Sequence, residues 1–191
     1  MSEQTATQQT ILNGVNVTQL GDTVELMKSN AELAQFKFRA SNKWIGGGHS
    51  RTTIKEFYGA CQEDTLRKKA HVIDIDEPEM LLGGDNGANP AEAILHALAG
   101  CITVTIAYKA AAHGIKIHEI ESEIEGDIDL RGLLEISDDV RNGFENIRVN
   151  FKIKADGPEE NLELFKDLAK GSPVFDMLTN PVPVTVNVES K

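Results

Sequence analysis

Residues 83–101 read GGDNGANPAEAILHALAGC, and this stretch decides the fold. Its first half is a loop rich in glycine and asparagine. Asn89 then stands where a helix N-cap is expected, Pro90 at the first helical position, and Glu92 at the third, which completes a capping-box pattern. The sequence therefore predicts a helix that begins at Pro90 and runs to the stop signal at Gly114.

This predicted helix is apolar on almost every side, which is typical of a buried central helix rather than a surface helix. Its apolar positions are Ala91, Ile94, Leu95, Leu98, Cys101, Ile102, Val104, Ile106 and Ala110. A membrane span is the rival interpretation. Glu92, His96 and Lys109 bracket fewer than about 18 uncharged apolar residues, which is below the usual requirement, so we expect no membrane helix here.

Both strand patterns and helical patterns occur on either side of this helix. Alternating strand patterns occupy 36–40, 51–57, 71–76, 116–130, 145–155 and 181–188, and helical patterns occupy 22–34, 158–170 and 172–178. The strand at 116–130 is expected to pair antiparallel with the strand at 145–155, and the glycines at 46–48 to form a turn between strands. The fold class predicted from this order is α+β.

Composition limits the classes of function. The 191 residues suit one domain, and a net charge of −11 with scattered Lys and Arg argues against nucleic acid and anionic membranes as partners. The N-terminal MSEQTATQQT has neither a basic region nor an apolar run, so no secretory signal is expected. Cys61 and Cys101 are too few for a disulfide scaffold, and a cytoplasmic protein with reduced thiols is expected. The five histidines lack metal-ligand spacing, and no Walker or dinucleotide motif is present, so neither metal nor cofactor is expected.

Two motifs resemble a known family. The segment 83–101, with Pro90 eleven residues before Cys101, and the segment SPVFDMLTNPVPVTV at 172–186 resemble the OsmC / organic hydroperoxide resistance (Ohr) family. The resemblance covers roughly residues 36–189. It implies an OsmC-like fold, with antiparallel sheets around a long buried central helix, and an intertwined homodimer. It also divides the chain into an N-terminal extension, 1–35, and a single OsmC-like domain, 36–191.

The resemblance further implies a thiol peroxidase that reduces organic hydroperoxides, in which a peroxidatic cysteine forms a sulfenic acid and a second cysteine resolves it. Cys101 matches the peroxidatic cysteine, Arg51 lies near the family's arginine, and Glu92 is one residue beyond the position of the family's glutamate. Ser172 stands where the family has its resolving cysteine. The resolving thiol would therefore be Cys61 or an external small thiol, with a dithiol as the expected reductant.

Each of these residues also has a plainer interpretation. Cys101 would serve as a small core residue, Glu92 and Ser172 as helix caps, Arg51 as a surface group on a strand, and Cys61 as an incidental thiol. The helix dipole acts only over the first turn, so it does not activate Cys101, about 16 Å along the helix. Two functions follow: thiol-based peroxide reduction, or binding of a small apolar molecule in the pocket at the dimer interface.

Overall fold

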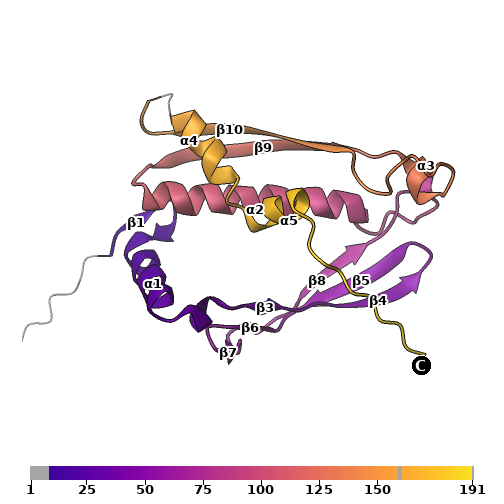
Figure 1. The fold of residues 1–191 in the computed structure, drawn as a ribbon, viewed down its shortest axis with the longest axis horizontal. Helices are drawn as coiled ribbons and strands as arrows, with labels where there is room; N and C mark the ends of the chain where they lie inside the picture. Colours follow the sequence, from indigo (N-terminus) through magenta and orange to yellow (C-terminus); the bar gives the residue numbers. More distant parts are fainter. Residues whose placement is uncertain (1–8, 159–160, 191) are drawn as a thin grey trace, which may run out of the picture.

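One long helix organises the computed structural model, which describes residues 9–158 and 161–190 (Figure 1). This helix, α2, spans Pro90–Ala112 with Asn89 as its N-cap, and the predicted capping box with Glu92 is present. Gly114 follows the helix with φ +73°, as expected for a stop. By length and composition α2 could cross a membrane. In the structure its buried residues are Leu98, Ile102, Ile106, Ala110 and Ala111, and four of them belong to the hydrophobic core.

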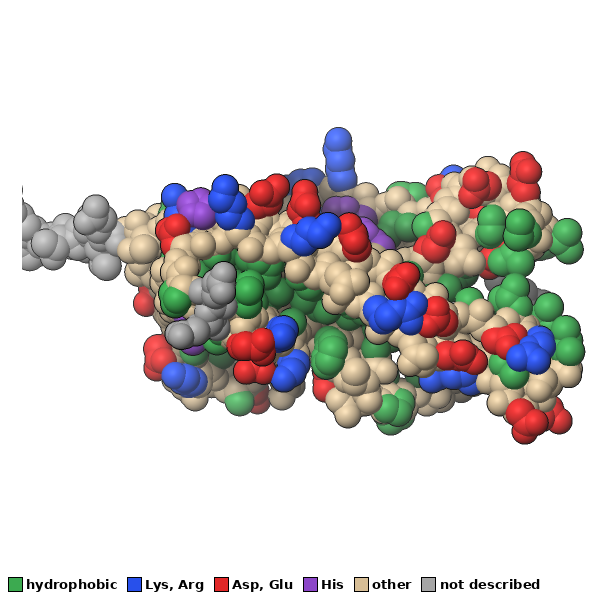
Figure 2. All heavy atoms as spheres, turned by 90° about the horizontal axis from the view of Figure 1, so that it is seen from above, with side chains coloured by type: hydrophobic (Ala, Val, Ile, Leu, Met, Phe, Trp, Pro, Cys, Tyr) green, Lys and Arg blue, Asp and Glu red, His purple; other side chains and the backbone are tan. Residues whose placement is uncertain are grey.

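A pair of long antiparallel strands covers one side of α2: β9 (Ile117–Asp127) and β10 (Asn146–Ala155). This confirms the predicted strand pair. Every second side chain faces α2, and the alternate ones face outward. Figure 2 shows the outward side, where acidic and basic side chains are mixed and hydrophobic side chains gather at the end that carries α3 (Leu130–Leu133). The apolar row against the core includes Ile120, Val149, Phe151 and Ile153.

Two short helices complete this core: α4 (Asn161–Ala169) and α5 (Pro173–Thr179). Phe165 and Leu168 of α4 are buried in one cluster with the covered side of α2. Burial of such side chains is the main stabilising contribution of the fold, and truncation of a core Phe typically costs about 3–5 kcal/mol. The helices predicted at 158–170 and 172–178 are both present, with residues 159–160 outside the described part.

The opposite layer is formed by short strands that precede α2 in the sequence (Figure 1). One antiparallel sheet has the order β4-β5-β8, and a second has the order β3-β6-β7. Gly47, at φ +56°, forms the predicted turn between β4 and β5. The bounds are β3 Lys37–Phe38, β4 Ser41–Gly46, β5 His49–Ile54, β6 Phe57–Gly59, β7 Gln62–Glu63, β8 His71–Ile75, and the 3-10 helix η2 Glu79–Leu81.

The N-terminal part begins with a small hairpin, β1 (Ile11–Leu12) and β2 (Val15–Asn16), followed by α1 (Val17–Ser29) and the 3-10 helix η1 (Ala31–Ala34). The helix predicted at 22–34 was therefore placed wrongly: the Asn16 side chain caps a start at Val17, and Asn30 ends the α-helix. Asn13 ties the hairpin to the connection between α2 and β9. Its Oδ1 accepts from Ile117 N at 2.8 Å, and its Nδ2 donates to Ile115 O at 2.9 Å.

Within one chain, the predicted central helix is buried on one side only. One side of α2 carries exposed apolar residues, including Ile94, Val104 (55% exposed) and Tyr108 (48% exposed). We call Ile94, Ala97, Gly100, Cys101, Val104 and Tyr108 the open face of α2. The β9–β10 sheet, α4 and α5 leave this face uncovered, because they pack against the residues on the other side.

The closing strand predicted at 181–188 is not formed in one chain. Within the described residues this segment pairs with no strand, although valine alternates with other residues through it. The four valines Val182, Val184, Val186 and Val188 are exposed, the last by 90%. The pattern predicts a strand, and a single chain provides no edge that pairs with it.

Candidate functional site

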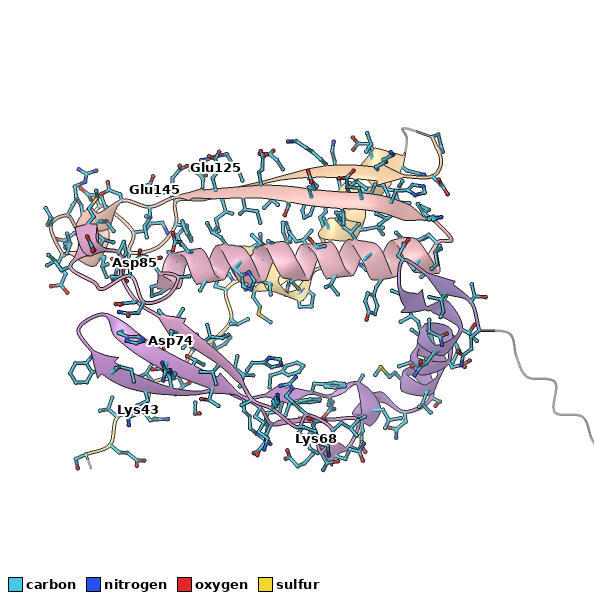
Figure 3. The ribbon with its side chains drawn as sticks, turned by 180° about the vertical axis from the view of Figure 1, so that it is seen from behind. Lys43, Lys68, Asp74, Asp85, Glu125 and Glu145 are labelled. Atoms are coloured by element: carbon cyan, nitrogen blue, oxygen red, sulfur yellow. The ribbon has the colours of Figure 1, made fainter. Side chains whose placement is uncertain are left out.

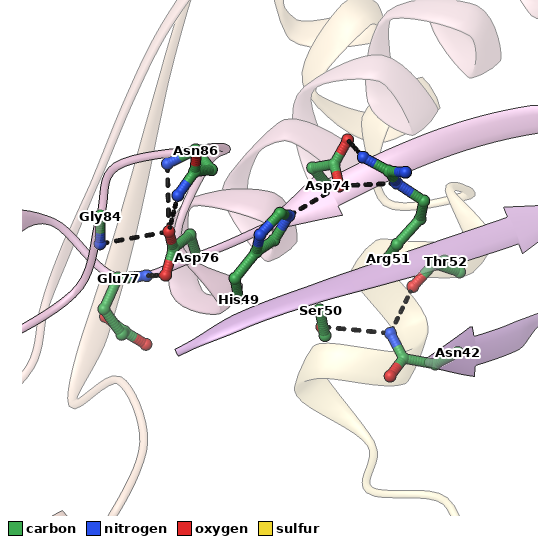
Figure 4. A network of polar contacts seen from close by, with 10 residues as sticks. All are labelled: Asn42, His49, Ser50, Arg51, Thr52, Asp74, Asp76, Glu77, Gly84 and Asn86. Carbon is green, nitrogen blue, oxygen red and sulfur yellow. Dashed lines mark hydrogen bonds and ion pairs between the residues drawn. The ribbon is translucent and has the colours of Figure 1, made fainter. Parts of the chain in front are cut away.

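The loop that leads into α2 is clamped by one buried carboxylate, Asp76, which is 1% exposed (Figure 4). Its Oδ2 accepts from the Asn86 side chain at 2.6 Å and from the backbone N–H groups of Asn86 and Gly84 at 3.2 Å. Its Oδ1 accepts from Glu77 N at 2.8 Å. The Asn86 side chain, followed by the backbone donors, lowers the pKa of Asp76 to about 2. Asp76 is therefore ionised at neutral pH, and its carboxylate holds the loop through these hydrogen bonds. We call these contacts the Asp76 clamp.

The same loop lies directly against β8. A Cβ added to Gly87 would lie 2.2 Å from the backbone oxygen of Asp74, so only glycine fits there. An isolated bridge joins Ile75 to Ala88, and Asp76 N donates to Ala88 O at 3.4 Å. The start of α2 is thus fixed to the end of β8.

Glu92 acts as a helix cap in this structure. Its Oε2 accepts from Asn89 N at 2.9 Å, while Asn89 Oδ1 accepts from Ala91 N at 2.8 Å and Glu92 N at 3.0 Å. The Asn89 side chain also donates to Glu77 Oε2 at 2.9 Å. A role of Glu92 in chemistry remains a prediction, and the observed contacts are those of a capping box.

Cys101 lies at the start of the fourth turn of α2, on the open face. Its thiol is free and half-buried. The surface beside its neighbour Gly100 is open, since a Cβ at that position would meet nothing within 4 Å. Among residues 9–158 and 161–190, no hydrogen bond joins the Cys101 thiol to Arg51, Glu92 or Cys61. The thiol is thus reachable from the uncovered side of the helix.

Arg51 lies on β5 and is bound by Asp74 of β8 (Figure 4). The two residues are direct partners in the antiparallel register. Arg51 Nε donates to Asp74 Oδ1 at 2.9 Å and Nη2 donates to Oδ2 at 3.2 Å. His49 Nε2 lies 2.8 Å from the same Oδ1. Arg51 chiefly, and then His49, lowers the pKa of Asp74 by these hydrogen bonds, so the carboxyl is ionised at neutral pH.

Cys61 lies apart from this region in the tight turn between β6 and β7. Its side chain is exposed and its thiol is free. Ala60 and Cys61 both have positive φ, 49° and 61°, which are the left-handed conformations of a two-residue hairpin turn. A role as resolving thiol remains a prediction, since Cys61 and Cys101 are unbonded here.

Ser172 is completely buried (0% exposed) at the start of α5. Its Oγ accepts from Phe175 N at 3.2 Å, and its N–H donates to Ala169 O at 3.0 Å. Pro173 occupies the first helical position. Ser172 is therefore an N-cap in this structure, as its plainer interpretation predicts.

Two apolar cavities flank Phe175 beside α2. One of about 530 Å³ is lined by Ile94, Leu98, Ile147 and Leu178, among others. The other, of about 540 Å³, is lined by Ile102, Ile106, Phe151 and Leu162, among others. Their lining and size suit a small apolar molecule. In the described part of the chain, no three His, Cys, Asp or Glu side chains are grouped as metal ligands would be.

His49 and Asp74 are the members of this region that the sequence interpretation missed. The pattern His49-x-Arg51 on one strand places both side chains on one face of the sheet, which is a signal visible in the sequence. The pairing with Asp74 depends on the register between β5 and β8, which no local pattern gives.

Comparisons with known proteins support this architecture. The family model for OsmC-like protein matches residues 83–187, more than half of the chain. The solved structure of an OsmC-like protein from Mycoplasma pneumoniae has 18% identity and a TM-score of 0.59, over 76% of this chain and 89% of its own. An organic hydroperoxide resistance protein OsmC from Legionella pneumophila, also described as a redox protein, has 16% identity and a TM-score of 0.51, over 75% and 90%.

A third solved structure, an OsmC-like protein of unknown function from Vibrio cholerae, has 11% identity and a TM-score of 0.53, over 72% of this chain and 90% of its own. No curated protein matches the chain. At these identities the structures show the fold, and the family model shows the family. The chain belongs to the OsmC-like protein family.

Proposed function

We propose that this protein reduces organic hydroperoxides through the thiol of Cys101 and works as a cytoplasmic homodimer. Membership of the OsmC-like family associates the chain with redox and peroxide stress-response functions. The observation that carries the proposal is the position of Cys101. It is a free, half-buried thiol on an uncovered apolar face, within the residues 83–187 that the family model matches.

The proposed reaction has three steps. The Cys101 thiolate attacks the terminal oxygen of the hydroperoxide, the O–O bond breaks, and the departing alkoxide takes up a proton and leaves as an alcohol. Cys101 is then a sulfenic acid. A second thiol attacks its sulfur, a disulfide forms, and water leaves. A dithiol reductant exchanges with this disulfide and restores the Cys101 thiol.

Ser172 has no thiol, so the second step needs another sulfur. In the proposal it comes from Cys61, which is exposed, or from an external small thiol. Arg51 is the proposed cation beside the thiolate, because a guanidinium favours the ionised form of cysteine. Glu92 is a further proposed member of the site.

The homodimer is supported by two uncovered surfaces. The open face of α2 exposes Val104 and Tyr108, and the segment 181–190 exposes four alternating valines. Exposed contiguous apolar surface of this kind marks an interface. A second copy would cover the open face and enclose the region around Cys101.

The test is peroxide consumption by the full chain, with cumene, tert-butyl and hydrogen peroxide, each in the presence of dithiothreitol or glutathione. We expect Cys101→Ser to abolish consumption. Cys61→Ser should slow turnover only if Cys61 resolves the sulfenic acid. Equal consumption by wild type and Cys101→Ser would overturn the proposal.

Binding of a small apolar molecule is the second candidate function. It is favoured by Ser172 at the position of the resolving cysteine and by the apolar cavities beside Phe175. Its test is the melting temperature with an apolar fluorescent probe or a medium-chain alcohol, since a ligand that binds only the folded state raises it. Saturable stabilisation together with absent peroxide turnover would favour binding.

A further inference from the structure

Three side chains on one face of the β5–β8 pair form a cluster: His49, Arg51 and Asp74 (Figure 4). Arg51 is half exposed, whereas the Asp74 and His49 side chains are less exposed. Ser50, Thr52 and Asn42 lie on the other face of the same sheet, with Asn42 Nδ2 donating to Thr52 Oγ1 at 2.8 Å. The sheet thus presents two separate polar networks, one on each side.

The hydrogen bonds fix the guanidinium of Arg51 by one edge only. The Asp74 carboxylate accepts hydrogen bonds from Arg51 Nε at 2.9 Å and from Arg51 Nη2 at 3.2 Å. Within the described residues, Nη1 has no hydrogen-bond acceptor. A bidentate carboxylate fixes the plane of a guanidinium as well as its position, which a single contact does not do. Arg51 is therefore held in one orientation with a donor edge left for a further anion.

His49 makes this arrangement more rigid. Its Nε2 lies 2.8 Å from the Oδ1 atom that also accepts from Arg51 Nε. The Asp74 carboxylate is thereby held from two directions. The strand β8 that carries it continues into the clamped loop at Asp76 and then into α2, and Figure 3 shows Asp74 below the first half of α2.

We propose that Asp74 is a positioning residue for the peroxide reaction. It holds Arg51 so that the Nη1 edge is presented to an anion, the thiolate of Cys101 or the oxygen that gains charge as the O–O bond breaks. This inference rests on the proposed function. It assigns to Asp74, held in turn by His49, a task that the family resemblance gives to no residue at this position.

A purely structural ion pair is the alternative, and the chain contains a matched example. Arg148 on β10 bonds Glu125 at 2.7 Å and also pairs with Asp127, on the outward face of the β9–β10 sheet. Such exposed pairs contribute little to stability. Asp127→Asn therefore removes a carboxylate that pairs with an arginine, as Asp74→Asn does, but at a position without a role in the proposed reaction.

The experiment uses the full chain in a Cys61→Ser background, so that Cys101 is the sole thiol. The rate of alkylation by iodoacetamide is measured from pH 5 to pH 10, with circular dichroism to verify folding. Asp74→Asn should lower the rate at pH 7 roughly tenfold, as Arg51→Ala should, because a guanidinium that is no longer held in place would not favour the reactive thiolate. The double variant should show no further loss, Asp74→Glu should recover most of the rate, and Asp127→Asn should match the parent.

Two results would overturn the inference. If Asp74→Asn reacts as fast as the parent or faster, while Arg51→Ala reacts slowly, Asp74 does not position Arg51. If neither variant changes the alkylation profile, Arg51 does not act on Cys101. In either case Cys101→Ser can still abolish peroxide consumption, so failure of this inference is distinguishable from failure of the proposed function.

Discussion

Glu92 and Cys101 lie nine residues apart on α2, and at about 100° per residue their side chains leave the helix on opposite sides. The Glu92 carboxylate is bonded to Asn89 N at the helix start, while Cys101 lies on the open face. One chain thus does not bring these two predicted site residues together. A complete site would need groups from the opposite layer or from a second copy.

The first prediction concerns assembly. We expect light scattering at micromolar concentration to give twice the 20.8 kDa mass of one chain. Val104→Asp places a charge on the open face and should give monomers, because burial of an unpaired charge in an interface is unfavourable. Leu133→Asp, at an exposed apolar residue on α3, is the control and should stay dimeric. A monomer mass for the wild type would contradict the account.

The second prediction concerns pH and the Asp76 clamp. The pKa of Asp76 in the folded state is about 2, below its ordinary value of 3.8, so the ionised clamp stabilises the fold above about pH 4. This contribution is lost as pH falls from about 4 to 2. Asp76→Asn should melt at a lower temperature than wild type at pH 7, and the gap should narrow toward pH 2.

Thermal melts between pH 2 and pH 7 check this. Asp85→Asn, in the same loop, is a suitable control, since none of the side-chain hydrogen bonds of the clamp involves it. A difference between wild type and Asp76→Asn that stays constant over the whole range would show that the charge of Asp76 is not the stabilising element.

The third prediction concerns Ser172, the clearest departure from the family motif. Ser172→Cys should supply a second thiol beside α2 and form a disulfide with Cys101 after oxidation, which requires Cα atoms about 5–6 Å apart or modest movement. Dithiol-dependent peroxide consumption should then rise above wild type. The lost cap costs about 1 kcal/mol, which a domain of this size tolerates.

Peptide mass spectrometry of the peroxide-treated variant decides this prediction. Ser172→Ala is the control for loss of the cap without gain of a thiol. If the thiols at positions 101 and 172 stay accessible and no bond joins them, the placement of the resolving position is wrong.

The local signals in the sequence predicted most of the fold. The capping pattern of Asn89, Pro90 and Glu92 determines where α2 starts, and the alternation in 117–127 and 146–155 determines β9 and β10. These are interactions between near neighbours in sequence. The start of α1 was missed because the apolar residues around it have only a weak helical period. Asn16 is the N-cap, but Leu20 and Gly21 give no clear sign that a helix has already begun.

The sequence pattern did not predict which segments far apart in the chain pair with one another. The segment 181–188 alternates as a strand does, but whether it finds an edge depends on other strands or on another copy. The contact between Arg51 and Asp74 depends in the same way on the register of β5 with β8. The apolar pattern of α2 predicted that the helix needs cover on every side, but such a pattern does not tell how much of that cover comes from the same chain.

The most direct measurement is trapping of the oxidised thiol. The Cys61→Ser protein is treated with one equivalent of cumene hydroperoxide in the presence of dimedone, which reacts with sulfenic acids, and the peptides are analysed by mass spectrometry. The account predicts a dimedone adduct on Cys101 and release of one equivalent of cumyl alcohol. An unmodified Cys101 in a folded, peroxide-treated protein would contradict the claim that this thiol performs the reaction.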